Sequence, residues 1–172
     1  MIEELIERIQ KCVEERDTVL DLGCGIMGIT KNLKCKSVLG VDAWYPYLDS
    51  VKETQNVLCM PINKDTVSYF VNDSFDVVTM LDFVEHFEKE EAFNVIKHAE
   101  RIARKKIIIF TPEGFLEQED SLSWGKGNPK YQKHRCGFTS QELEMMGYEI
   151  KKFPTKHDGK DIVMLLGVKD LK

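Results

Sequence analysis

Acidic residues and glycines alternate in one short stretch of the chain, where an apolar run ends. Asp21 is followed by Gly23, Gly25 and Gly28, and the residues just before it are typical of a buried strand. Glycines at positions 23 and 25 allow a tight turn and a close approach of the backbone to a ligand. Free amides at the start of a following helix would donate hydrogen bonds to an anionic group. We therefore expect a strand, a ligand-binding turn and a helix here.

The spacing of the three glycines also fits a dinucleotide-binding fingerprint, Gly-x-Gly-x-x-Gly. Asp42 follows nineteen residues after Gly23, as that fingerprint requires. However, a carboxylate at Asp21 would repel a pyrophosphate and would attract a ligand that carries an ammonium and a sulfonium group. S-adenosylmethionine carries both groups and has no phosphate, so it fits this turn better than a dinucleotide does.

Residues 21–25, Asp-Leu-Gly-Cys-Gly, resemble the first motif of the class I S-adenosylmethionine-dependent methyltransferases, an acidic residue, any residue and then Gly-x-Gly. The third glycine of that family falls at the position of Met27, whereas this chain has Gly28. The resemblance extends over nearly the whole chain and is weakest over residues 112–138. The cofactor-binding residues that it implies in this turn are Asp21, Gly23, Cys24 and Gly25.

Further cofactor contacts are implied after the second strand. Asp42 would end that strand, where its two carboxylate oxygens can bind both ribose hydroxyls; alternatively, it caps the next helix. Ala43 and Trp44 follow directly. The Trp44 indole would lie against the adenine or, equally well, on the protein surface.

The contact with the adenine amino group departs from the pattern of the family. The family often has an aspartate within the stretch that corresponds to residues 59–62, and this chain has none there. Asn63 or Asp65 would have to substitute. The remaining cofactor contacts that the resemblance implies are Ile62 and Leu81.

Residues 81–86, Leu-Asp-Phe-Val-Glu-His, resemble the family's fourth motif, which lies beside the transferring methyl group. Asp82 would position or deprotonate the substrate. Glu85 and His86 would orient a nucleophile or act as a base, because histidine titrates near neutral pH. The alternative is that Glu85 and His86 only tie down the turn into the next helix.

Residues 112–138 contain glycines, prolines and charges without helical periodicity, which predicts a long loop or lid. Residues 111–114 would form either a simple turn or a substrate contact. Basic residues follow around two aromatic rings, which is either ordinary surface or a grip for an anionic acceptor. Its members are Lys126, Lys130, Lys133, His134 and Arg135, around Trp124 and Tyr131. We expect Trp124, Tyr131 and Arg135 to contact the substrate.

Strands and helices alternate over the first 110 residues, which predicts an α/β fold with a mostly parallel sheet. Thr139 and Glu142 form a capping box at the start of a short helix. The family implies a Rossmann-like seven-stranded sheet that has helices on both faces and ends in an antiparallel hairpin. The expected strands are residues 19–22, 37–41, 56–59, 75–81, 106–110, 148–153 and 162–168. The expected helices span residues 2–13, 28–33, 47–52, 65–71, 89–104 and 139–146.

Length and composition place the chain among ordinary globular proteins. With 172 residues it is expected to form one domain, residues 1–172. A net charge of −5 argues against nucleic-acid binding, and the sequence has neither an apolar membrane span nor a signal peptide. Five cysteines without a C-x-x-C pair predict neither a disulfide framework nor a metal site. We expect a cytoplasmic protein with reduced cysteines.

These observations favour a methyltransferase that moves the methyl group of S-adenosylmethionine to an oxygen, nitrogen or carbon atom of a small-molecule acceptor. Two alternatives stay open. One is a nicotinamide-dependent oxidoreductase, which the glycine spacing alone would allow. The other is a non-catalytic module that binds S-adenosylmethionine, because the chain is short and leaves little room for a separate substrate domain. The oligomeric state is not predicted.

Overall fold

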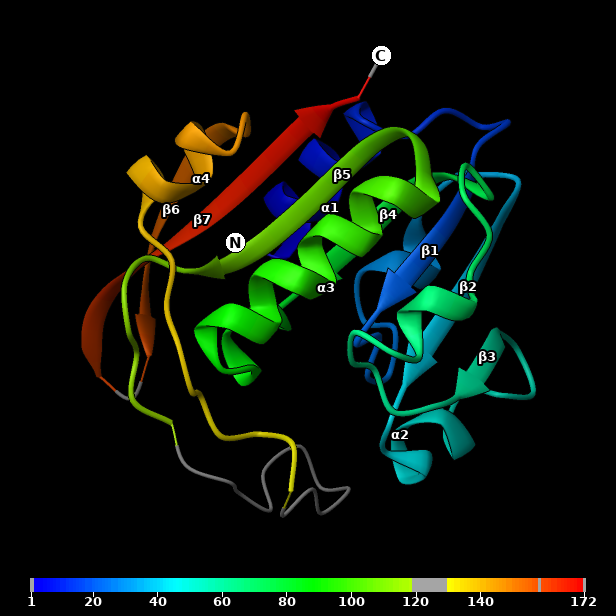
Figure 1. The fold of residues 1–172 in the computed structure, drawn as a ribbon, viewed down its shortest axis with the longest axis horizontal. Helices are drawn as coiled ribbons and strands as arrows, with labels where there is room; N and C mark the ends of the chain where they lie inside the picture. Colours follow the sequence, from blue (N-terminus) through cyan, green and yellow to red (C-terminus); the bar gives the residue numbers. More distant parts are fainter. Residues whose placement is uncertain (1, 119–129, 158, 172) are drawn as a thin grey trace.

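A computed structural model of the protein describes residues 2–118, 130–157 and 159–171. Its centre is a seven-stranded sheet with the strand order β3-β2-β1-β4-β5-β7-β6 (Figure 1). The strands are β1 (Thr18–Leu22), β2 (Ser37–Asp42), β3 (Asn56–Cys59), β4 (Phe75–Leu81), β5 (Ala103–Pro112), β6 (Glu149–His157) and β7 (Lys160–Asp170). The α-helices are α1 (Ile2–Lys11), α2 (Tyr45–Asp49), α3 (Lys89–Ile102) and α4 (Ser140–Met145). Three 3₁₀-helices are η1 (Thr30–Asn32), η2 (Val67–Tyr69) and η3 (Val84–His86).

The sheet is parallel from β3 to β5 and antiparallel in the hairpin of β6 and β7. This confirms the Rossmann-like α/β fold with a closing hairpin. The apolar run of β4 predicts a strand covered on both faces, and its five central residues are buried. The carboxyl ends of the parallel strands meet at one edge of the sheet, which we call the carboxyl edge.

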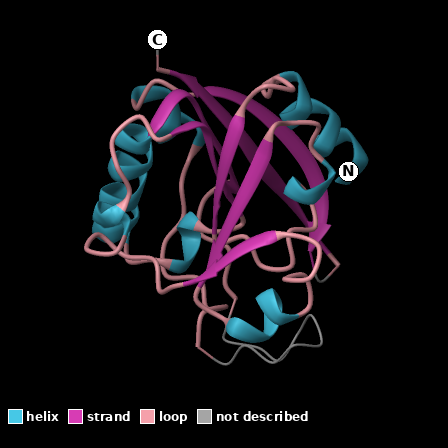
Figure 2. Ribbon diagram, turned by 90° about the vertical axis from the view of Figure 1, so that its right-hand side faces the viewer, coloured by secondary structure: helices cyan, strands magenta, loops and turns pink. Residues whose placement is uncertain are grey.

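Helices cover both faces of the sheet (Figure 2). On one face, α1 buries Leu5 and Ile9 against Val19 and other strand residues. On the opposite face, α3 and α4 share a larger core, in which Ile96 and Leu143 are fully buried. No helix within the described residues is long and apolar enough to cross a membrane.

Several element bounds differ from the prediction. The helices expected at residues 28–33 and 65–71 are only the short 3₁₀-helices η1 and η2. Strand β5 begins directly after α3, at Ala103. Strands β6 and β7 are also longer than expected and continue almost to the turn between them. Pro154, which lies outside the expected strands, therefore pairs with Val163 inside the ladder.

The predicted lid, residues 112–138, is described in two arms, residues 113–118 and 130–138. The arms contain isolated bridges of Glu113 and Gly114 with Phe138 instead of regular strands. Two backbone hydrogen bonds join them, from Gly114 to Phe138 and from His134 to Gln118. The absence of regular helix and strand was therefore predicted correctly for both described arms, and they are paired with each other.

Candidate active site

The glycine turn after β1 is held by the backbone of β2. Gly23 and Gly25 have φ values of 73° and 51°, a left-handed conformation that favours glycine. The amides of Gly23 and Cys24 both donate to the carbonyl oxygen of Val41, at 2.8 and 3.0 Å. A side chain at position 23 would also collide with the ring of Phe83, whose Cδ2 atom lies 2.0 Å from the position of an added Cβ. The turn is thereby fixed against the residues that follow β4.

The expectation that this turn opens a helix with free amides is wrong. Only the three residues of η1 are helical, and several amides of the turn already have backbone or carboxylate partners. The amide of Met27 donates to the carbonyl of Cys24 at 2.7 Å. The dipole of a three-residue helix is small, so the turn offers little attraction to an anion.

Met27 takes the left-handed conformation, with a φ of 53°, at the position where the family has its third glycine. Its side chain is buried in a small cluster with Cys24 and Leu48. Gly40 on β2 makes room for this cluster, because an added Cβ would lie 2.7 Å from the Cys24 sulfur and 3.0 Å from that of Met27. Because Gly40 has no side chain, there is room for the side chain of Met27, where the family has a glycine.

Asp21 lies in the sheet opposite Thr79 of β4 and is buried. One carboxylate oxygen accepts a 2.7 Å hydrogen bond from the Thr79 hydroxyl, and the other accepts a 2.6 Å bond from Thr30. Burial raises the pKa of Asp21 to about 6, against the opposing effect of the two hydroxyls. Asp21 thus connects β1, β4 and η1 directly beneath the turn.

Asp42 joins the end of β2 to the glycine turn. Its Oδ2 atom accepts a 2.9 Å hydrogen bond from the Gly25 amide, and Oδ1 accepts a 2.7 Å bond from the Trp44 amide. Burial raises the pKa of this carboxyl group as well. Each carboxylate oxygen can accept more than one hydrogen bond, so both remain able to bind ligand hydroxyls. Ala43 and Trp44 are half-buried beside it.

The other predicted cofactor residues lie partly or wholly in the core. Cys24 and Ile62 are buried, and Leu81 is half-buried at the end of β4. Asn63 accepts hydrogen bonds from the amides of Asp65 and Thr66, which orders the loop after β3. These two hydrogen bonds already use the side-chain oxygen of Asn63, which together with Asp65 is a candidate to substitute for the missing aspartate.

Two carboxyl groups, those of Asp82 and Glu85, follow the end of β4. Asp82 has a φ of 49°, and its amide donates to the carbonyl of Phe110 on β5. Glu85 is buried and accepts a 3.0 Å hydrogen bond from the Thr111 hydroxyl. Burial raises the pKa of Glu85. The surrounding protein and the Glu85 carboxyl group raise the pKa of Asp82, although this residue is open to solvent on one side.

His86 faces the second arm of the loop. Its Nδ1 atom lies 3.2 Å from the carbonyl oxygen of Lys133, and its ring centroid lies 5.0 Å from that of His134. Burial lowers the pKa of His86. It also lowers the pKa of His134 to about 4, so both rings are neutral at neutral pH. Sequence reasoning missed the pairing of His134 with His86, since 48 positions separate them.

Arg135 holds the second arm against η3. Its Nη1 atom donates to the carbonyl oxygens of His86 and Lys133, at 2.9 and 3.1 Å. The amides of Arg135 and Cys136 both donate to the carbonyl of Glu85. At least one guanidinium nitrogen therefore orders the protein itself.

The predicted basic cluster is wrong in one member. His134 is buried and neutral, and its Nδ1 atom lies 2.7 Å from the carbonyl oxygen of Leu116. Lys130 lies on the surface beside the ring of Tyr131. Trp124 and Lys126 lie outside the described residues.

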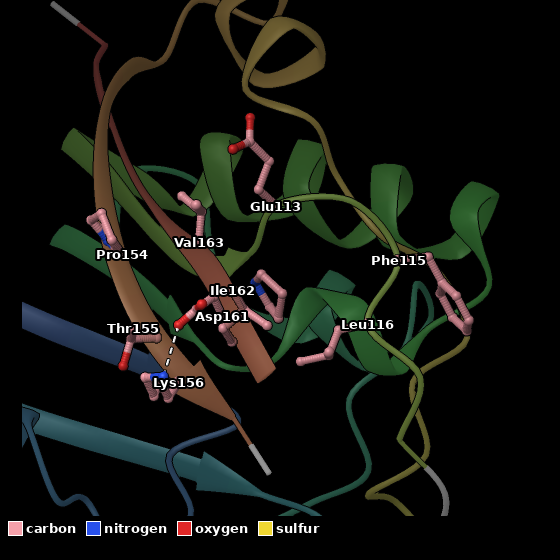
Figure 3. A pocket seen from close by; sticks show the side chains of 10 residues that line it. Glu113, Phe115, Leu116, Pro154, Thr155, Lys156, Asp161, Ile162 and Val163 are labelled. Carbon is pink, nitrogen blue, oxygen red and sulfur yellow. Dashed lines mark ion pairs between the residues drawn. The ribbon is translucent and has the colours of Figure 1, made fainter. Parts of the chain in front are cut away.

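A hollow of about 620 Å³ opens at the carboxyl edge between the first arm and the hairpin (Figure 3). Most of its lining is apolar, and Lys156 and Asp161, which face each other on β6 and β7, pair at 3.2 Å in its wall. It contains none of the predicted catalytic or cofactor residues. Its lining residue Leu116 contacts His134 through its carbonyl oxygen, and the His134 ring in turn contacts the predicted catalytic residue His86. The apolar lining residues are Pro112, Phe115, Leu116, Pro154, Ile162 and Val163.

A family model described as a methyltransferase domain matches residues 20–110, which include the glycine turn and the residues after β4. This match covers more than half of the chain. The chain belongs to the methyltransferase domain family. It is an S-adenosylmethionine-dependent methyltransferase, and the oxidoreductase alternative is not supported.

Solved structures share the fold of this methyltransferase at low sequence identity. An S-adenosylmethionine-dependent methyltransferase from Methanosarcina mazei is 18% identical, over 95% of this chain and 96% of its own, with a TM-score of 0.70. The magnesium protoporphyrin IX methyltransferase from Synechocystis, solved with S-adenosylhomocysteine, is 16% identical over 98% and 81%, with a TM-score of 0.63. The 1,6-didemethyltoxoflavin-N1-methyltransferase from Burkholderia thailandensis is 15% identical over 98% and 77%, with a TM-score of 0.67. No curated protein matches the chain in sequence.

The turn leaves open space at two of its glycines. A Cβ added at Gly25 or Gly28 would meet no protein atom within 4 Å, so a ligand can approach the backbone there. Asp42 ends β2 beside this open space, with its carboxylate fixed by Gly25 and Trp44. The cofactor of this methyltransferase is S-adenosylmethionine.

Proposed function

We propose that this methyltransferase methylates an oxygen, nitrogen or carbon atom of a small molecule held at the carboxyl edge of the sheet. The observation that carries the proposal is the hollow of about 620 Å³ at this edge, which is connected to His86 through Leu116 and His134. Its volume lies within the range of about 300–1,000 Å³ that is typical of small-molecule sites. The two named neighbours that act on a protoporphyrin and on a toxoflavin precursor are consistent with such an acceptor.

We assign the cofactor to the glycine turn and the end of β2. Asp42 would bind the ribose hydroxyls, and Asp21 would favour the positively charged end of the cofactor by its charge. Gly23, Cys24 and Gly25 would present their backbone, while Ala43, Trp44, Ile62 and Leu81 would surround the adenosine. Bound S-adenosylmethionine supplies a methyl group that is activated by its sulfonium.

We assign acceptor positioning to Asp82, Glu85 and His86. The neutral imidazole of His86 can accept a proton from an acceptor, and Asp82 can hold an acceptor hydroxyl or amine as it is oriented. Such orientation by itself can lower a barrier by about 7–11 kcal/mol. Tyr131 and Arg135 would contact the acceptor from the second arm.

The proposal is tested by turnover. The enzyme is incubated with S-adenosylmethionine and a panel of small hydroxyl, amine and carboxylate compounds, both neutral and anionic, and release of S-adenosylhomocysteine is measured. We expect turnover with at least one class of compound and its loss in Asp82→Ala. Turnover with peptides or nucleic acids only would contradict the small-molecule acceptor.

The assignment of Asp42 is tested separately by titration calorimetry with S-adenosylhomocysteine. Asp42→Ala should weaken binding by about 1–3 kcal/mol, because the ribose hydroxyls lose a buried partner. Asp170→Ala is the matched control, since Asp170 pairs with Lys106 far from the carboxyl edge. Equal affinity in Asp42→Ala and the control would remove Asp42 from the cofactor site.

A further inference from the structure

Two histidines and one carboxylate come together where the second arm meets η3. Glu85, His86 and His134 each offer one ligand atom, and these atoms all lie within 4.8 Å of one another. The part of the chain that the structure describes contains one group of three or more such side chains, and these three residues are its members. Two imidazoles and a carboxylate are a common ligand set for zinc and related metals.

The hydrogen bonds of the two rings prepare them to bind a metal. A carbonyl oxygen can only accept, so the contact to Leu116 places the proton of the His134 ring on Nδ1 and leaves a lone pair on its Nε2 atom. The contact to Lys133 favours the same form of His86. Metal-binding histidines are usually oriented in this way, by a hydrogen bond from the other ring nitrogen. The Asp82 backbone also interacts with the His86 ring, and a metal would have to compete with it.

The electrostatics of the site also favour a cation. Glu85 is buried, and Asp82 is close enough for the two carboxyl groups to affect each other. The hydroxyl of Thr111 donates to Glu85 but carries no charge. The Arg135 guanidinium acts on the His86 ring, and its Nη1 atom donates to the carbonyls of His86 and Lys133. Burial raises the pKa of Glu85, and a divalent ion bound to its carboxylate would favour the ionised form.

We propose that Glu85, His86 and His134 bind one divalent transition-metal ion, such as Zn²⁺. In a tetrahedral site with bonds of about 2.0–2.1 Å, the ligand atoms would stand about 3.4 Å apart. The three ligand atoms, which lie within 4.8 Å of one another, therefore have to move closer together when the ion binds. Three protein ligands leave one position for water or for an oxygen atom of the acceptor. This goes beyond the proposed methyl transfer and does not depend on it; the ion and an acceptor proton would compete for the one lone pair of His86.

The first test is direct binding to the full chain, without a methyl acceptor. After treatment with a chelator, the protein is titrated with Zn²⁺ by calorimetry, and we expect one ion per chain. Glu85→Gln keeps the shape of the side chain and removes its charge. Loss of a side chain that only hydrogen-bonds to a metal ligand typically weakens metal binding by about 10–100-fold. Glu85→Gln and His86→Ala change the ligands themselves, so we expect each to weaken Zn²⁺ binding by at least that factor. His98→Ala, on the outer part of α3, is the matched control and should bind as the wild type does.

The second test uses the wild-type protein only, because His134→Ala removes a buried side chain and could unfold the site. In ¹⁵N-labelled protein, the imidazole signals should show the Nδ1–H form of His86 and His134. Zn²⁺ should shift the Nε2 signals of these two rings and leave those of His98 and His157 in place. Zn²⁺ binding without these shifts, binding of equal strength in Glu85→Gln, or no binding at all would overturn the proposal.

Discussion

Burial at the carboxyl edge changes how single carboxyl groups behave. Asp21 lies beneath the glycine turn, and burial raises its pKa to about 6, so part of the protein carries it in the neutral form at slightly acidic pH. A positively charged cofactor favours the ionised form. Affinity for S-adenosylmethionine should therefore rise with pH between about pH 5 and 7 and stay level above that range. Calorimetry over this range measures the slope.

Other groups near Asp21 also titrate, so the pH experiment needs control variants. Asp42 also has a raised pKa, and His86 lies within electrostatic reach of Asp42. Asp21→Asn should bind S-adenosylmethionine more weakly at pH 7.5 and with a flatter pH profile. Asp42→Asn should lose affinity and keep the part of the slope that Asp21 causes. If Asp21→Asn keeps the full slope, another group is responsible.

The pairing of Gly40 with Met27 predicts a stability effect at a single residue. Gly40→Ala brings a methyl group within 2.7 Å of the Cys24 sulfur, so the packed cluster must shift. We expect a loss of about 1–3 kcal/mol in the free energy of unfolding, as is typical of overpacking. Gly28→Ala is the control, since an added Cβ there meets no protein atom within 4 Å. Urea unfolding compares the two variants, and similar stabilities would contradict the packing argument.

At the level of elements, periodicity predicted the strands better than the short helices. The run from Phe75 to Leu81 is apolar because both faces of β4 are covered, and that pattern is visible in the sequence. The segments around η1 and η2 are too short for a helical period to develop. There, single contacts decide the conformation, such as the Thr30 hydroxyl on Asp21 or the Arg101 guanidinium on the carbonyl of Val67.

The capping box of α4 was predicted from two residues and is present. Thr139 accepts from the Glu142 amide at 3.1 Å, and the Glu142 carboxylate accepts from the Thr139 amide at 2.8 Å. Glu142 also pairs with Lys89 of α3 at 2.9 Å, so the cap connects two helices. Thr139→Ala should lower the free energy of unfolding by about 0.5–2 kcal/mol, whereas Thr139→Ser should stay near the wild type. Urea unfolding measures both; equal loss in the two variants would show that the hydroxyl is not what matters.

The site as a whole could be predicted only in part, because distant segments complete it. The residues of the glycine turn and those after β4 are local motifs, and they were recognised as such. His134 reaches Glu85 and His86 only because the second arm folds back along the carboxyl edge. Arg135, which is expected to contact the acceptor, also holds that arm in place through the His86 carbonyl. No spacing in the sequence carries this information.

The second arm also connects two halves of the carboxyl edge, which are the residues after β2 with α2 and the residues after β4 with η3. Gln132 donates a 3.0 Å hydrogen bond to the hydroxyl of Tyr47 on α2, which begins directly after Trp44. A cofactor that orders Asp42 and Trp44 should therefore also steady α2 and, through Tyr47, the arm. Hydrogen exchange of residues 130–138 should slow when S-adenosylhomocysteine binds, because these amides open less often.

Gln132→Ala tests whether this contact couples the halves. The variant should lose most of the added protection in residues 130–138. Its binding free energy for S-adenosylhomocysteine should weaken by at most about 0.5–1.5 kcal/mol, the contribution of one hydrogen bond. Gln141→Ala, on the exposed side of α4, should behave as the wild type does, and the amides of α1 serve as an internal reference. If the added protection survives in Gln132→Ala, the arm is held through Glu85 and the backbone of η3 alone. If no added protection occurs in the wild type, the two halves bind their ligands independently.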